Sequence, residues 1–273
     1  MLNRYEGYAW NDRFLPRLTT NQIKELPKED ALVILPIGAV EQHGTHLPVY
    51  TDTLLAETVL TETFQYLPEH LNIWLLPALP YSKSNEHAMW SGTISLSFTT
   101  LQGIIMDIAK SIKQSGFKRL IIFNTHGGNN DLLKMMMREI RLETGMSVFY
   151  IFIGALPIDT ALFNDVEIKY GIHGGALETS MVMASRPDWV RTEYVSKDIS
   201  EQIVHSKYLK YQQGNFAWTI DDISTNGICG DARDASAEKG RIIYQQHSKL
   251  IAEILLEMAE FEFYHINKEG VQP

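Results

Sequence analysis

The sequence contains a single cysteine, Cys229, among 273 residues. One thiol excludes both an intrachain disulfide and a zinc finger built from cysteines. Basic residues are also in deficit, because 24 Lys and Arg stand against 33 Asp and Glu, for a formal net charge of −9. This balance argues against a dedicated nucleic-acid-binding protein, which usually carries a basic stripe. Because only one cysteine is available, any bound metal must use histidine and carboxylate ligands.

Long apolar runs are missing too. The most apolar stretches, residues 31–40, 71–79 and 147–157, are shorter than the roughly 18 residues that a membrane-spanning helix needs. The first residues lack the basic start and apolar run of a secretory signal. With no linker-like or repetitive tract either, we expect one cytoplasmic domain over residues 1–273, with no membrane association.

What is present is an alternation of short apolar runs with helical patterns. Strands are predicted at residues 32–37, 73–76, 119–123 and 147–153. Helices are predicted from about Thr53, around residues 101–112, at 131–144, at 176–184 and from about Ser236 to about Phe263. Gly116 is placed to end the helix around residues 101–112. Strands that are apolar throughout are typical of a parallel sheet covered on both faces. The predicted fold class is therefore α/β, a single domain with a central, mostly parallel β-sheet and helices on both faces. Residues 185–235 show little pattern and form either an insertion or a surface lobe.

Polar side chains gather where the predicted strands end. In a parallel sheet, ligands bind beyond the carboxyl ends of the strands. The residues that follow these ends are Glu41, Gln42, His43 and Asp52, then Asn85, Glu86 and His87, then Asn124, His126, Gly127, Gly128 and Asn129, and finally His173 and Glu178. Four loops could thus bring these groups together.

These residue types suit a metal site. Glu41 and His43 are two residues apart, so in extended backbone they face the same side. Asp52 could bridge two metals, His126 adds a second nitrogen and Glu178 a further oxygen. Two imidazoles and three carboxylates suit Zn, Mn or Fe(II), and a two-metal site hydrolyses amides, cyclic amides or phosphate esters.

Each residue alone also has an ordinary interpretation. Asp52 could be a helix N-cap, Glu178 an exposed acid early in a helix, and His126 a hydrogen-bonding partner for a neighbouring turn. Because all of these would have to coincide at successive strand ends, the metal site is the better hypothesis. The glycine pairs Gly127-Gly128 and Gly174-Gly175 each precede a helix and could hold an anion through backbone N–H groups. Neither pair fits a nucleotide-binding fingerprint.

Longer motifs carry a resemblance to a known family. They are Pro36-Ile37-Gly38-Ala39-Val40-Glu41-Gln42-His43-Gly44-Thr45-His46-Leu47-Pro48 with Thr51-Asp52, Glu86-His87, Gly92-Thr93-Ile94-Ser95, Asn124-Thr125-His126-Gly127-Gly128-Asn129, His173-Gly174-Gly175 with Glu178-Thr179-Ser180, and Gly230-Asp231 with Ala235 to Gly240. In this order, over nearly the whole chain, they resemble the creatininase (creatinine amidohydrolase) family.

The resemblance implies one α/β domain with a dinuclear metal centre that hydrolyses non-peptide or cyclic C–N bonds. It implies Glu41, His43, Asp52 and His126 as ligands, with Asp52 as the bridge and Glu178 as the remaining carboxylate. His173 matches a histidine beside the metals that can shuttle a proton. Members commonly form homo-oligomers, including hexamers.

One position departs from the creatininases proper, in which a glutamate ligand follows the matching histidine after one residue. Here that position is Gly128, which weighs against creatinine as the substrate. The His-Gly-Gly-Asn form is closer to relatives that deformylate a formamidopyrimidine nucleotide.

The hypothesis is a dinuclear metal-dependent amidohydrolase acting on a small amide, formamide or cyclic amide through a metal-bridging hydroxide. His173 would protonate the leaving nitrogen, and Glu178 would belong to both the ligand set and the catalytic set. Glu86 and His87, with Gly127, Gly128 and Asn129, would line the substrate pocket or support the ligands. The alternatives are a non-catalytic ligand- or metal-binding protein on the same scaffold and a metal-dependent phosphoesterase.

Overall fold

The computed structural model describes residues 6–211 and 214–262. Its strands are β1 (Leu32–Ile37), β2 (Ile73–Leu75), β3 (Arg119–Asn124), β4 (Ser147–Phe152), β5 (Lys197–Asp198) and β6 (Gly230–Asp231). Its α-helices are α1 (Tyr8–Asn11), α2 (Thr20–Glu25), α3 (Thr51–Thr63), α4 (Phe98–Gln114), α5 (Asn130–Thr144), α6 (Asp165–Tyr170), α7 (Ala176–Ser185), α8 (Glu201–His205), α9 (Ile220–Ile223) and α10 (Ala237–Glu260).

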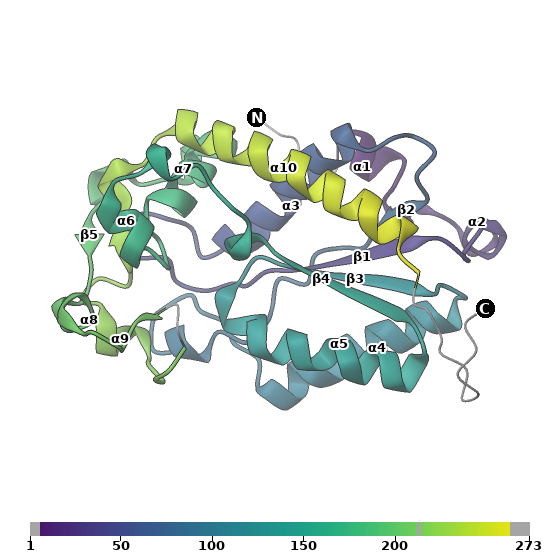
Figure 1. Ribbon diagram of the computed structural model, residues 1–273, viewed down its shortest axis with the longest axis horizontal. Coiled ribbons are helices and arrows are strands. Elements are labelled where there is room, and N and C mark those ends of the chain that lie inside the picture. Colours follow the sequence, from purple (N-terminus) through teal and green to yellow (C-terminus); the bar gives the residue numbers. More distant parts are fainter. Residues whose placement is uncertain (1–5, 212–213, 263–273) are drawn as a thin grey trace.

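The central sheet has the strand order β2-β1-β3-β4, with every neighbouring pair parallel. All six residues of β1 and all six of β3 are buried, as expected for strands with helices on both faces. Figure 1 shows α3 and α10 on one side of the sheet and α4 and α5 on the other. Each face has its own apolar cluster, which confirms the predicted fold class.

Helix ends follow local chemistry. The Ser97 hydroxyl accepts a hydrogen bond from the backbone N–H of Thr100 and so caps α4. Beyond that helix, Gly116 has a φ of 98°, a conformation that glycine adopts without strain. The C-terminal helix α10 ends at Glu260, earlier than the predicted end near Phe263. Phe261 and Glu262 are not helical, and Phe263 itself lies outside the described residues.

One helix start differs from the sequence expectation and matters for the site. Helix α3 begins at Thr51, because the Thr51 backbone N–H donates to the carbonyl of Pro48 and starts the first turn early. The N-cap position is Tyr50, so the N-cap interpretation of Asp52 is wrong. Asp52 lies inside the first turn and is 2% exposed.

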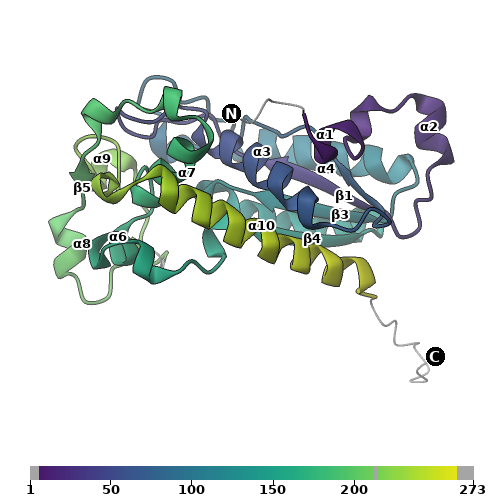
Figure 2. The same ribbon diagram turned by 90° about the horizontal axis from the view of Figure 1, so that it is seen from above.

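The described residues within 185–235 form a lobe of short helices with the two-stranded antiparallel pair β5–β6. The lobe has its own apolar cluster, which includes Ile203, Tyr211 and Cys229 and packs with Trp218. Figure 2 shows α8 and α9 at the same end of the molecule as α7. This is the end beyond the carboxyl ends of the sheet strands.

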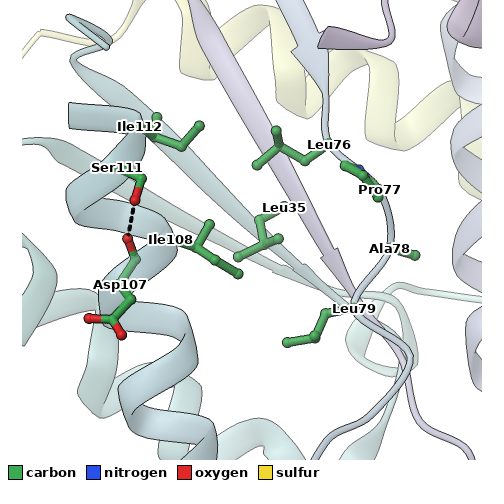
Figure 3. A pocket seen from close by; sticks show the side chains of 9 residues that line it. All are labelled: Leu35, Leu76, Pro77, Ala78, Leu79, Asp107, Ile108, Ser111 and Ile112. Atoms are coloured by element: carbon green, nitrogen blue, oxygen red, sulfur yellow. Dashed lines mark hydrogen bonds between the residues drawn. The ribbon is translucent and has the colours of Figure 1, made fainter. Parts of the chain in front are cut away.

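Within the described residues, no helix is long and apolar enough to cross a membrane. A groove of about 460 Å³ lies on the α4 face of the sheet. Figure 3 shows Leu35 of β1 and Ile108 and Ile112 of α4 directed into it, and the Ser111 hydroxyl donating to the Asp107 carbonyl at 2.7 Å. The groove contains none of the residues proposed from the sequence as a site.

Candidate metal centre

The loops after β1, β2 and β3 converge with the start of α7. Four groups of three potential ligands form there, each with its ligand atoms within 4.8 Å of one another. They are Glu41, His43 and His173; Glu41, Asp52 and His126; Glu41, Glu86 and His87; and His43, Asp52 and Glu178. The structure therefore brings together every carboxylate and imidazole proposed from the sequence.

Asp52 stands between two of these groups. Its Oδ1 is 3.4 Å from Nε2 of His43, and its Oδ2 is 3.3 Å from Nδ1 of His126. Glu178 Oε2 lies 3.8 Å from the same His43 nitrogen, and Glu41 Oε1 lies 3.2 Å from the same His126 nitrogen. One carboxylate thus faces two adjacent ligand sets, which is the geometry of a bridging ligand.

Backbone carbonyls fix the tautomers of both histidines. Nδ1 of His43 lies 3.1 Å from the Glu41 carbonyl, and Nε2 of His126 lies 3.0 Å from the Lys83 carbonyl. A carbonyl only accepts hydrogen bonds, so each of these nitrogens carries the proton. The other nitrogen of each ring then points its lone pair at the carboxylates, as metal-binding histidines do.

The cluster contains charged side chains although it is buried. Burial disfavours charge, yet the carboxylates of Asp52 and Glu178 outweigh it and raise the pKa of His43 well above its usual value. In the same way burial is outweighed at His126, whose pKa is raised well above the usual value by Glu41 and Asp52. Without metal, a proton on the nitrogen that faces the carboxylates compensates their charge in each ring, and a bound metal ion would take the place of that proton.

Buried side-chain atoms without a hydrogen-bond partner test whether these residues fit metal ions. Glu41 Oε2, His43 Nε2 and Asp52 Oδ2 are buried and have no hydrogen-bond partner. Native proteins rarely leave buried polar atoms unpaired. Here the three belong to the facing ligand sets, and imidazole nitrogen with carboxylate oxygen suits zinc or a similar divalent ion. The residues present fit two ions.

His173 and His87 are organised by Gln42. The side-chain Oε1 of Gln42 accepts from the Gly44 backbone N–H at 2.8 Å, which fixes its amide orientation. Its Nε2 then donates to Nδ1 of His87 and to the Gly227 carbonyl, both at 2.8 Å. Nε2 of His173 donates to the Gln42 carbonyl at 2.7 Å.

As a result, Nδ1 of His173 carries the lone pair, 3.6 Å from Glu41 Oε1. Burial and the nearby His43 imidazole lower the pKa of His173 well below its usual value. Burial likewise lowers the pKa of His87, to about 3. Both rings are neutral at physiological pH and stack with centroids 4.2 Å apart.

Other predicted pocket residues take distinct places. Asn129 is fully buried, and its side chain links to the Lys83 backbone N–H and the Asn124 side chain. Gly127 faces open space, whereas a Cβ atom at Gly128 would overlap the carboxylate of Glu86. That carboxylate lies 3.4 Å from Nε2 of His126.

The anion-binding role considered for the second glycine pair is wrong, because a carboxylate of the chain already fills the start of α7. Glu167 accepts from the backbone N–H groups of Leu177 at 3.2 Å and Asp231 at 2.6 Å. It is 5% exposed, and a Cβ atom at Gly175 would overlap it.

Sequence reasoning missed the contribution of the 185–235 lobe. Trp218 lies edge-on to His87, with ring centroids 6.5 Å apart, and the Trp90 indole donates to Asp221 at 2.7 Å. Cys229 bonds through its backbone to His173, while burial raises the pKa of its thiol to about 12. The tryptophans in an otherwise unpatterned stretch were the available signal.

The family model described as "Creatininase: Creatinine amidohydrolase" matches residues 16–255. The chain belongs to the creatininase family. The Mycofactocin precursor peptide peptidase of Mycobacterium ulcerans (strain Agy99) is 29% identical over 85% of this chain and 87% of its own length. The Creatinine amidohydrolase of Pseudomonas putida is 28% identical over 84% of this chain and 90% of its own length.

Solved structures agree on the fold. A creatinine amidohydrolase from Bacteroides fragilis NCTC 9343 superposes with a TM-score of 0.77 at 24% identity, over 97% of this chain and 100% of that one. A creatininase variant of the Zn-Zn type gives 0.72 at 25% identity, over 91% and 98%, and a manganese form has also been solved. This chain is thus a creatininase-family metal-dependent hydrolase. None of these relatives supports the formamidopyrimidine-deformylating branch.

Proposed function

We propose that this protein hydrolyses the C–N bond of a small amide, formamide or cyclic amide at a dinuclear metal centre. The observation that carries the proposal is Asp52, whose two oxygens face the ring nitrogens of His43 and His126 that are not bonded to backbone carbonyls. A carboxylate so placed would serve as a ligand in both sets.

The ligands divide into two sets that share Asp52. Glu41, Asp52 and His126 would hold one ion, and His43, Asp52 and Glu178 the other. When bound, two such ions supply a water activated as a nucleophile near neutral pH and polarise the substrate carbonyl.

His173 provides the proton transfer. Its Nδ1 lone pair faces Glu41, and its other nitrogen is held by the Gln42 carbonyl. A neutral imidazole so oriented accepts a proton from the attacking water and returns it to the leaving nitrogen. Trp218 and His87 would form the adjacent wall against which the substrate is positioned.

A second candidate is hydrolysis of a peptide bond. It is favoured by the similarity to mycofactocin precursor peptide peptidases, one of which, from Mycobacterium tuberculosis (strain ATCC 25618 / H37Rv), is 30% identical over 81% of this chain. Peptide and small-amide substrates share the carbonyl and the leaving nitrogen, so the same residues serve both.

Metal analysis and a substrate screen test the proposal. Wild-type protein loaded with zinc or manganese should carry two ions per chain and release ammonia, formate or a ring-opened product from amide substrates. Asp52→Asn should lose both ions and at least about 10³-fold in activity, because two-metal activation contributes several kcal/mol. Asp107→Asn, an exposed acid on α4, is the matched control.

An Asp52→Asn protein that keeps two ions and full activity would contradict the proposal. Turnover of short peptides in preference to small amides would favour the second candidate. Turnover of phosphoesters alone would refute both.

A further inference from the structure

The ring nitrogen of His126 that points away from the proposed metal ligands is surrounded by oxygen atoms of one short segment, residues 83–86. This nitrogen, Nε2, lies 3.0 Å from the Lys83 carbonyl, which fixes the proton on it. The Ser84 hydroxyl oxygen and Oε1 of Glu86 each lie 3.4 Å from the same nitrogen. Of these three oxygen atoms, only that of Glu86 belongs to a charged group.

Gly128 gives this carboxylate access to His126. A Cβ atom at Gly128 would overlap Oε1 of Glu86 and lie 2.5 Å from Nε2 of His126. The preceding Gly127 has nothing within 4 Å of the corresponding point. The lack of a side chain at position 128 therefore allows the carboxylate to lie beside the ring nitrogen.

The carboxylate of Glu86 is also shielded from solvent. Its side chain is 14% exposed, and its second oxygen, Oε2, lies 4.0 Å from the Lys83 amine. Because partly buried charges are screened less than exposed ones, the negative charge of Glu86 acts strongly on the adjacent N–H of His126. The corresponding nitrogen of His43, Nδ1, lies 3.1 Å from the uncharged backbone carbonyl of Glu41.

We propose that Glu86 is a positioning residue for the metal centre and acts through the ring of His126. The inference rests on the proposed dinuclear function. The carboxylate stabilises the proton on Nε2 of His126 and orients the ring, so the lone pair of Nδ1 faces Glu41 and Asp52. It also makes the imidazole a stronger donor to an ion bound there. Glu86 affects that ion only through the imidazole.

Zinc titration of the intact protein against a chelating dye tests this role. Glu86→Gln keeps the size of the side chain and removes its charge, whereas Glu86→Ala removes both. In each variant one of the two binding steps should weaken by about 10-fold or more, the usual loss when the partner of a ligating histidine is removed. Lys83→Met, which removes the amine near Oε2 and keeps the backbone carbonyl, is the matched control and should bind zinc as the wild type does.

Added formate makes the test specific for a carboxylate. Glu86→Ala leaves a space beside His126 that formate can fill, so formate should restore most of the lost zinc affinity. Formate should not restore the affinity of Glu86→Gln, because that side chain still fills the space. Wild-type protein at the same formate concentration corrects for the weak binding of zinc by formate in solution.

Proton NMR of the zinc-loaded protein adds a readout that a purely structural role would not change. Hydrogen bonds to charged acceptors are the stronger ones, so the Nε2–H resonance of His126 should shift upfield in Glu86→Gln. The Nδ1–H resonance of His43, which faces the Glu41 carbonyl, should keep its position. An unchanged His43 resonance also shows that the variant is folded.

Wild-type zinc affinity in both Glu86 variants would overturn the inference, as would equal responses of the two variants to formate. An Nε2–H resonance of His126 that does not move in Glu86→Gln would also overturn it. Absence of zinc binding by the wild type would overturn the proposed function itself. The two failures are therefore distinguishable.

Discussion

The chain uses the same three residues, His-Gly-Gly, in two turns that do different work. At His126 the turn leads into α5, and at His173 it leads into α7. In each, the second glycine leaves space for a glutamate from another segment, Glu86 in the first and Glu167 in the second.

The two glutamates differ in what they contact. Glu86 faces an imidazole nitrogen of the metal cluster, whereas Glu167 accepts hydrogen bonds from backbone N–H groups. A carboxylate satisfied by the backbone is structural, and one that lies beside the protonated nitrogen of a candidate ligand histidine is placed to support that ligand. The comparison shows that the His-Gly-Gly motif leaves space for a carboxylate, and that the atoms which the carboxylate contacts determine its role.

The largest expected contrast is in folding stability. Glu167→Ala should lower the free energy of unfolding by about 3 kcal/mol, because it leaves two buried backbone donors unpaired. Glu86→Ala should change it by less than about 1 kcal/mol in metal-free protein. Urea unfolding of both variants measures this, and equal losses would show that the two carboxylates play the same role.

A smaller contrast concerns the first glycine of each turn. Gly174 has a φ of 60°, and a Cβ atom there would lie 2.8 Å from Ile228. Gly174→Ala should therefore cost about 1–2 kcal/mol. Gly127→Ala should be neutral or stabilising by up to about 1 kcal/mol, since its surroundings are open. Thermal unfolding of the pair is the measurement, and a Gly127→Ala loss as large as that of Gly174→Ala would refute the distinction.

The smallest expected contrast is in the protonation of the two histidines that begin these turns. The carboxylates around His126 outweigh burial and raise its pKa, whereas burial and His43 lower the pKa of His173. His126 thus adds stability that is present below its unfolded pKa and is lost as pH rises through the folded value. His173 has the opposite sign, and stability is lost as pH falls below its unfolded pKa toward the folded one.

Nitrogen-detected NMR of metal-free protein should show His126 protonated and His173 neutral at pH 7. Zinc should displace the proton from His126 and leave His173 neutral. If both rings titrate together near pH 6.5, the two environments are not as different as the geometry indicates.

Much of the fold and of the site composition was predictable from local sequence. Strand β1 has the expected bounds, because a run of apolar residues between turn signals is diagnostic of a buried strand. The residues at the strand ends were identified because parallel strands all end at one edge. The start of α3 was not, since an Asp near a helix start suggests a cap, while the turn from Pro48 decides the register.

Contacts between distant segments could not be predicted in this way. Gln42 and Gly227 are 185 residues apart, and nothing in the periodicity of either segment links them. The approach of Glu86 to Gly128 also depends on how two loops fold over each other. Residue chemistry identified the candidate site residues, whereas the role proposed for each of them required the three-dimensional arrangement.

Asp52 has a further consequence, which concerns occupancy. In the proposed site one carboxylate belongs to both ligand sets, so a first ion would neutralise its charge before a second arrives. The affinity of each position would then depend on whether the other is filled. By thermodynamic linkage this dependence is reciprocal, so the two ions would bind as a coupled pair, and a chelator that removed one would change the affinity for the other.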